Sequence, residues 1–98
     1  MKIVAELSMY PLSDVHIPAI VEFILDLREQ EGIELVSNQL ATQVRGEYDA
    51  VTSAINSCMR RAMAKTQFNE QAMVMVVKYL NVDLEIGRAP TLTPPDAS

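Results

Sequence analysis

Residues 2–31 read KIVAELSMYPLSDVHIPAIVEFILDLREQE, and this stretch decides the fold because the spacing of its apolar residues changes within it. In residues 2–10 the apolar side chains alternate, which is the period of a β-strand. From about residue 15 or 18 to residue 31 they recur every three to four positions, which is the period of an amphipathic helix. The strand's predicted inner face is Ile3, Ala5, Leu7 and Met9, and the helix's predicted apolar stripe is Ile17, Ile20, Val21, Ile24 and Leu27.

Proline and glycine mark the ends of these two elements. Pro11 begins a break that runs to Asp14, between the strand and the helix. Pro18 must lie in the first helical turn, where its missing N–H costs least. Gly32 follows the helix at a position that favours a positive φ.

The rest of the chain repeats this order. Residues 33–39 and 40–45 predict two strands, followed by a helix that starts near residues 46–49 and runs to about Lys65, and by a last strand over residues 71–79. The second helix has its own apolar stripe, made of Val51, Ala54, Ile55, Cys58 and Ala62.

Two halves of β-α-β type predict a ferredoxin-like α+β fold of order βαββαβ, with a four-stranded antiparallel sheet and both helices on one face. The first and third strands should be central. The last strand has apolar residues on both faces, so we expect it to be covered on both sides. We expect one domain over residues 1–86 and a Pro-rich, flexible tail over residues 87–98.

Charge and cysteine content limit the classes of partner. The 98 residues include 8 Lys and Arg against 13 Asp and Glu, a formal net charge of −5. This balance argues against nucleic acid and against an anionic membrane surface, and it favours a neutral or cationic ligand. The single cysteine, Cys58, excludes an intrachain disulfide, and no apolar run approaches the ~20 residues of a membrane span. We expect a cytoplasmic protein.

Catalytic and metal-binding motifs are sparse. The glycines at 32, 46 and 87 are too far apart for a phosphate-binding loop, and one His with one Cys makes no metal cluster. No Ser-His-Asp or Cys-His set is supported. We interpret His16 as a surface residue and Cys58 as a core thiol. Tyr10 alone is too little aromatic surface for RNA stacking on the central strands. We therefore predict no catalytic residue, no metal and no cofactor.

Polar side chains interrupt the predicted sheet and are the remaining candidates for a site. Glu6 and Ser8 alternate with apolar residues on the first strand, and Asn38 and Thr42 lie on the second and third. Their period alone favours an open sheet face in contact with water over a binding site.

Two segments resemble the YkoF-related thiamine-binding family. LSMYPLSD at residues 7–14 resembles its strand end, where a Tyr-Pro pair precedes acidic residues and the first helix. NQLATQVRGE at residues 38–47 resembles its segment with a Ser-Thr pair, a valine and a glycine before the second helix. The resemblance covers about residues 2–86. Ala41 replaces the serine of that pair, and Asn38 replaces an acid that some members carry, so both departures change what a ligand meets.

The resemblance implies a protein that binds thiamine or its hydroxymethylpyrimidine part as a carrier or sensor, and that is not an enzyme. An aminopyrimidine needs hydrogen-bond donors and an acceptor, which Asn38, Thr42 and Ser8 offer. Its ring needs an apolar wall such as Tyr10 or Leu40, and the cationic thiazolium of thiamine favours a nearby carboxylate. The expected ligand-binding residues are Glu6, Ser8, Tyr10, Asn38, Thr42 and Glu47.

Two other functions stay open at this point. The sheet face could serve as the interface of a structural or regulatory homo-oligomer that has no thiamine ligand. Alternatively, Glu6 or Glu47 could act as the base of a small hydrolase or isomerase. Ligand binding without turnover separates the expected function from the hydrolase or isomerase.

We expect a homo-oligomer, either a dimer or a dimer of dimers. Single-copy members of the family assemble in this way, and apolar residues on both faces of a strand would otherwise leave an exposed apolar surface. Light scattering at micromolar concentration checks this expectation. A particle of 10.9 kDa, the mass of one chain, would contradict it.

Overall fold

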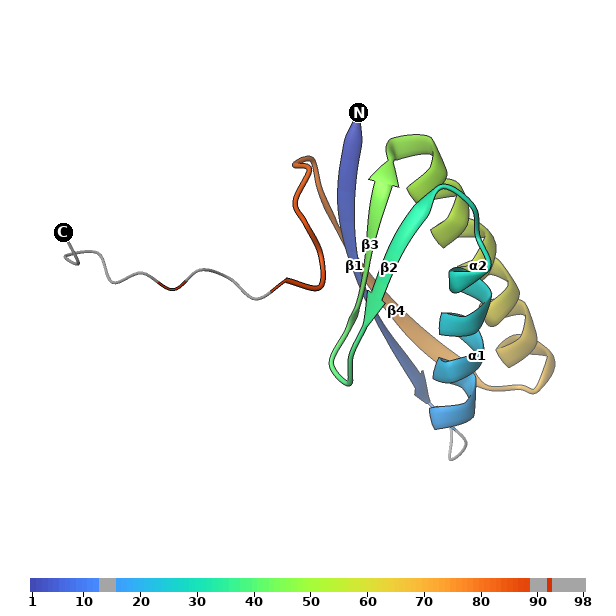
Figure 1. The fold of residues 1–98 in the computed structure, drawn as a ribbon. Helices are drawn as coiled ribbons and strands as arrows, with labels where there is room; N and C mark the ends of the chain where they lie inside the picture. Colours follow the sequence, from blue (N-terminus) through green and yellow to red (C-terminus); the bar gives the residue numbers. More distant parts are fainter. Residues whose placement is uncertain (13–15, 89–91, 93–98) are drawn as a thin grey trace, which may run out of the picture.

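The computed structural model describes residues 1–12, 16–88 and 92 of the chain. Along the chain the elements are β1 (Lys2–Leu12), α1 (His16–Arg28), β2 (Ile33–Ser37), β3 (Thr42–Glu47), α2 (Tyr48–Phe68) and β4 (Ala72–Leu80). One sheet and one layer of two helices make up the domain (Figure 1). The predicted order βαββαβ and the ferredoxin-like class are confirmed.

The sheet is antiparallel throughout, with strand order β2-β3-β1-β4. β1 and β3 are therefore central, as the sequence predicts. Leu7 lies opposite Thr42 on β3 and opposite Val77 on β4. Because side chains alternate along a strand, this register puts all three on the face that the helices cover. The other side of the sheet, which we call the open face, carries Glu6, Ser8 and Tyr10 of β1, Gln43 and Arg45 of β3, and Val74, Val76 and Leu80 of β4.

The core lies between the covered face and the helices. Ile3, Ala5 and Leu7 of β1 are buried together with Val44 of β3. The predicted stripe of α2 is confirmed, since Val51, Ala54, Ile55 and Cys58 are buried and Ala62 packs against them. Burying apolar area at about 25 cal/mol per Å² makes this layer contact the main source of stability.

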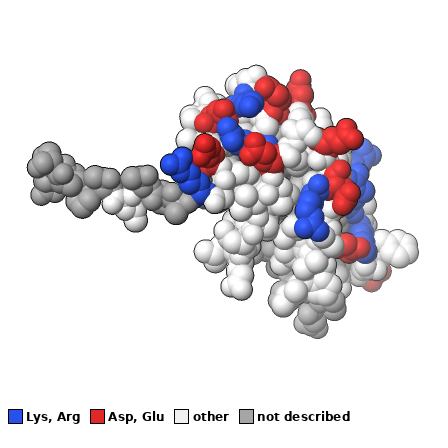
Figure 2. Space-filling model, in the orientation of Figure 1, with Lys and Arg blue, Asp and Glu red and all other residues white. Residues whose placement is uncertain are grey.

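The predicted stripe of α1 is wrong in part. Ile17 and Val21 are 64% and 48% exposed, whereas Phe23 and Leu27 are buried. The inner face is instead formed by Ile20, Phe23, Ile24 and Leu27, which keep the i, i+3, i+4, i+7 spacing of a helix face. Periodicity could not choose between the two stripes because α1 is apolar around most of its circumference. The bulky Phe23 turns inward. In the view of Figure 2, the lower central part of the surface is a broad area without charged side chains.

Turns set the element boundaries that the sequence leaves open. The β2–β3 hairpin turns at Asn38, whose Oδ1 accepts hydrogen bonds from the backbone N–H groups of Leu40 and Ala41, at 2.8 and 3.1 Å. β2 therefore ends at Ser37, two residues before the predicted end, and β3 begins at Thr42, two residues after the predicted start. Gly32 has a φ of +80°, as predicted. α2 follows β3 without a loop and runs three residues past Lys65, to Phe68.

Residues 81–88, which we call the C-terminal strap, lie on the open face. Arg45 donates a hydrogen bond of 2.7 Å to Asp83, and Gly87 lies so close to Val36 that a Cβ there would sit 2.9 Å from a Val36 methyl. Figure 1 shows the strap on the side of the sheet away from the helices. Most of the predicted tail, residues 89–91 and 93–98, falls outside the described residues, as do residues 13–15 and the side chain of His16. No helix in the described part is long and apolar enough to cross a membrane.

The corrected orientation of α1 can be tested with two leucines of the same helix. Leu27 is fully buried and Leu25 is 44% exposed. Leu27→Ala should lower the free energy of unfolding by about 2–5 kcal/mol, because it leaves a cavity in the core. The matched control Leu25→Ala should change it by less than about 1 kcal/mol. Urea denaturation gives both values, and equal losses would mean that the helix is oriented differently.

Candidate ligand-binding site

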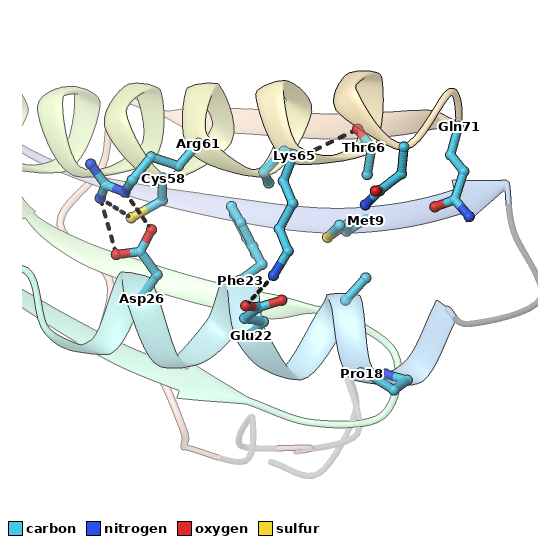
Figure 3. Close-up of a pocket in the computed structure, with 13 residues that line it drawn as sticks. Met9, Pro18, Glu22, Phe23, Asp26, Cys58, Arg61, Lys65, Thr66 and Gln71 are labelled. Carbon is cyan, nitrogen blue, oxygen red and sulfur yellow. Dashed lines mark hydrogen bonds and ion pairs between the residues drawn. The ribbon is translucent and has the colours of Figure 1, made fainter.

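A pocket of about 690 Å³ opens between α1 and α2, on the helical side of the domain. We call it the interhelical pocket. α1 and α2 supply most of the wall, Met9 reaches it from β1, and Gln71 closes it just before β4 (Figure 3). Its volume is typical of small-molecule sites, which span roughly 300–1,000 Å³.

Small side chains create the space between the helices. Ala19 of α1 and Ala62 of α2 both line the pocket, and neither reaches far across it. Met9 is partly exposed there, whereas Phe23 is 4% exposed and Cys58 is fully buried beneath the wall. A ligand ring could therefore pack against the thioether of Met9, together with the small exposed part of Phe23.

Two ion pairs bridge the helices along this pocket. Arg61 donates hydrogen bonds of 2.8 and 3.0 Å to the two carboxylate oxygens of Asp26. One turn further on, Lys65 Nζ contacts Glu22 Oε1. The hydrogen bonds from Arg61 lower the pKa of the Asp26 carboxyl below its ordinary value, against a smaller opposing effect of burial. Both carboxylates come from α1 and both cations from α2, each pair of like charges four residues apart.

The end of the pocket beyond Lys65 is polar. Thr66, Asn69 and Gln71 line it, from the last turn of α2 to the start of β4. The hydroxyl of Thr66 donates to the carbonyl oxygens of Ala62 and Met63. Glu70, with a φ of 57°, turns the chain there, and the N–H of Gln71 bonds to the carbonyl of Thr66 at 2.8 Å. Two side-chain amides, each able to donate and accept, thus lie at the rim of an apolar pocket.

Cys58 is the one thiol and lies at the inner end of the pocket. It is fully buried, and burial raises the pKa of its thiol to about 11, with a further contribution from the Asp26 carboxylate. Arg61 donates to its Sγ at 3.5 Å. A thiol that keeps its proton is a poor nucleophile and metal ligand. The interpretation of Cys58 as a core residue is confirmed.

The six residues predicted to bind the ligand do not form one cluster. Glu6, Ser8 and Tyr10 do share a surface, because all three project from the open face of β1. Glu6 lies 3.9 Å from Lys78 of β4, and Tyr10 is exposed. This surface faces away from the interhelical pocket, on the opposite side of the sheet.

The other three predicted residues lie apart from it. Thr42 is buried on the covered face, where its hydroxyl is 2.8 Å from that of Ser37. Asn38 holds the hairpin turn with its side-chain oxygen. Glu47 is at the other end of the sheet and pairs with the amino group of Met1 at 3.0 Å. Each has a structural partner, and their part in ligand binding stays a prediction.

The residues of the interhelical pocket were not predicted from the sequence. The predicted polar candidates lay on or beside the strands, and the helices were interpreted only through their apolar stripes. One signal was available, because Glu22 and Asp26 on the first helix match Arg61 and Lys65 on the second in spacing and opposite charge. That pattern predicts two helices bridged by charges, although it does not by itself predict a pocket.

Family comparison agrees with the fold described above. The model of the YKOF-related family matches residues 2–78. The chain belongs to this family. No curated protein matches the chain significantly. The expected membership is thereby confirmed, and the family match ends just before the C-terminal strap.

Solved structures share this fold with the YKOF-related chain. A Streptococcus pneumoniae protein is 24% identical, with a TM-score of 0.72 over 89% of this chain and 92% of its own. A hypothetical protein of Methanocaldococcus jannascii is 18% identical, with a TM-score of 0.67 over 93% and 88%. A Thermotoga maritima protein, described as a candidate for thiamine biosynthesis or salvage, is 14% identical, with a TM-score of 0.62 over 92% and 90%. At these identities the likeness establishes the fold alone.

Cys58 gives this site a testable pH dependence. The folded thiol keeps its proton to about pH 11, whereas an unfolded thiol loses it near its ordinary pKa of 9.0. The stability that Cys58 contributes is therefore complete below pH 9.0 and is lost as the pH rises from 9.0 to about 11. Melting temperatures of the native chain should fall more steeply over this range than those of Cys58→Ala. Parallel curves for the two proteins would contradict the assignment.

Proposed function

We propose that this chain binds thiamine or its hydroxymethylpyrimidine part in the interhelical pocket, and that it acts as a carrier or sensor without chemical turnover. The observation that carries this proposal is the pocket itself: about 690 Å³ of space with an apolar wall and polar groups at one end. Sites for small heterocycles combine these features.

The polar groups of the pocket match an aminopyrimidine. Its amino group needs an acceptor and its ring nitrogens need donors, and the side-chain amides of Asn69 and Gln71 offer both. The partly exposed Met9 offers an apolar contact for the ring, and the nearly buried Phe23 lies in the same wall. Membership of the YKOF-related family and the fold shared with the Thermotoga maritima protein support a ligand of this class.

Binding without turnover is part of the proposal. The charged groups in the pocket are carboxylates and cations already paired across the helices, and the buried thiol keeps its proton. None of these groups is poised as a free base or nucleophile. A cytoplasmic setting suits a chain with a single, reduced cysteine.

A homo-oligomer is compatible with this function. The predicted cover on both faces of β4 exists on one side within the chain, where Met75 and Val77 pack against the core, while Val74 and Val76 are exposed. A second chain could cover the open face and leave the interhelical pocket accessible. This face also favours the alternative of an oligomer with no thiamine ligand, so ligand binding must be measured directly.

Calorimetry with thiamine, hydroxymethylpyrimidine and thiamine diphosphate tests the ligand. We expect the first two to bind and the diphosphate to bind no more tightly, because the chain is acidic overall and lacks a glycine-rich loop for a phosphate. Diphosphate binding that is tighter by tenfold, about 1.4 kcal/mol, would contradict this expectation.

The position of the site can be tested in the same measurement. Ala62→Leu should fill the pocket and lower the affinity by tenfold or more, an estimate of about 1.4 kcal/mol or above. The matched control Ala64→Leu adds the same side chain on the exposed side of α2 and should bind normally. If Ala62→Leu binds normally while Ser8→Ala and Tyr10→Ala do not, the ligand lies on the open face of the sheet.

A further inference from the structure

The two ion pairs that bridge the interhelical pocket differ in strength. The pair between Asp26 and Arg61 has two short hydrogen bonds, in the fork geometry that arginine forms with a carboxylate. Its guanidinium also donates to Cys58, which ties it to the core. This inner pair is a fixed link between the helices.

The outer pair between Glu22 and Lys65 is exchangeable. It has one contact, and the two side chains are 61% and 60% exposed. Exposed pairs of this kind contribute little stability because water solvates both charges when they separate. Figure 3 shows Lys65 extending across the pocket toward Glu22, so its ammonium group occupies the position beside this carboxylate.

We propose that Glu22 selects ligands with a positively charged group, and that this group takes the position of the Lys65 ammonium. This inference rests on the proposed function of the interhelical pocket. The exchange replaces one cation by another, so the carboxylate stays neutralised. Lys65 can release it at small cost, because its ammonium group is at the end of a flexible stem and can move into water.

A cation is favoured over an anion in this exchange because of the net charge of the chain. The chain has a net charge of −5, and such a charge attracts cations and repels anions before contact. The two helix ends at the pocket do not add to this preference, because they act in opposite directions. α2 ends there, and its last carbonyl groups favour positive charge. α1 begins there, and the N–H groups of its first turn favour negative charge, although Pro18 itself has none.

Lys65 is consequently an internal competitor for the ligand. Removing it should tighten binding of a cationic ligand, because Glu22 is then vacant and the repulsion from the ammonium is gone. Removing the charge of Glu22 should have the opposite effect. A ligand with the same ring but no charge should be indifferent to both changes, and this difference separates charge selection from a general effect on the pocket.

The experiment measures Lys65→Met and Glu22→Gln by calorimetry with thiamine, which is cationic, and with hydroxymethylpyrimidine, which is neutral. We expect Lys65→Met to raise the thiamine affinity about fivefold and Glu22→Gln to lower it about fivefold, the size of one partly solvated charge pair. The affinity for hydroxymethylpyrimidine should change by less than about twofold. Melting temperatures should stay near that of the native chain, since the pair is exposed.

Matched variants control for net charge. Arg60→Met removes a cation from α2, and Glu29→Gln removes an acid just after α1; neither residue lines the interhelical pocket. Both should leave thiamine binding within about twofold. Weaker thiamine binding by Lys65→Met, or equal shifts for both compounds, would overturn the selection by Glu22 while leaving the pocket as the site. Failure of the native chain to bind either compound would overturn the proposed function and this inference together.

Discussion

The packing of α2 against the central strands is the contact on which the rest of the molecule depends. Val51, Ile55 and Cys58 of this helix are fully buried and share one core with Leu7 of β1 and Val44 of β3. Because the three helix residues fix both the position and the rotation of α2, they also decide which of its side chains face α1. The charged residues Arg61 and Lys65 continue the same helix beyond the core, in the wall of the interhelical pocket.

The interhelical pocket exists because the two helices do not interlock at that end. Phe23 and Leu27 anchor α1 in the core, but Ala19 and Ala62 face the pocket and are too small to fill the space. Long charged side chains bridge the gap instead. In the proposed ligand exchange, only the ion pair between Glu22 and Lys65 separates, with no rearrangement of the sheet.

The two sides of the sheet have separate roles in this arrangement. The covered side supports the helices and the pocket, while the open face carries the C-terminal strap, which Arg45 holds through Asp83. Gly87 of the strap packs close to Val36, whereas Val74, Val76 and Tyr10 are exposed. The proposed assembly through the open face and the proposed ligand binding between the helices therefore involve different surfaces of the molecule.

The sequence by itself determined the fold and the family. The alternation in β1, the stripe of α2 and the turn at Gly32 are local patterns, and each follows from the spacing of side chains along one element. The segments at residues 7–14 and 38–47 identified the family because short motifs are linear features of the chain. Only the tertiary structure decided the rotation of α1, because a helix that is apolar around most of its circumference fits its neighbours in more than one rotation. It alone also revealed the interhelical pocket, since a cavity depends on how far apart two helices pack, and that distance is set by side chains from both.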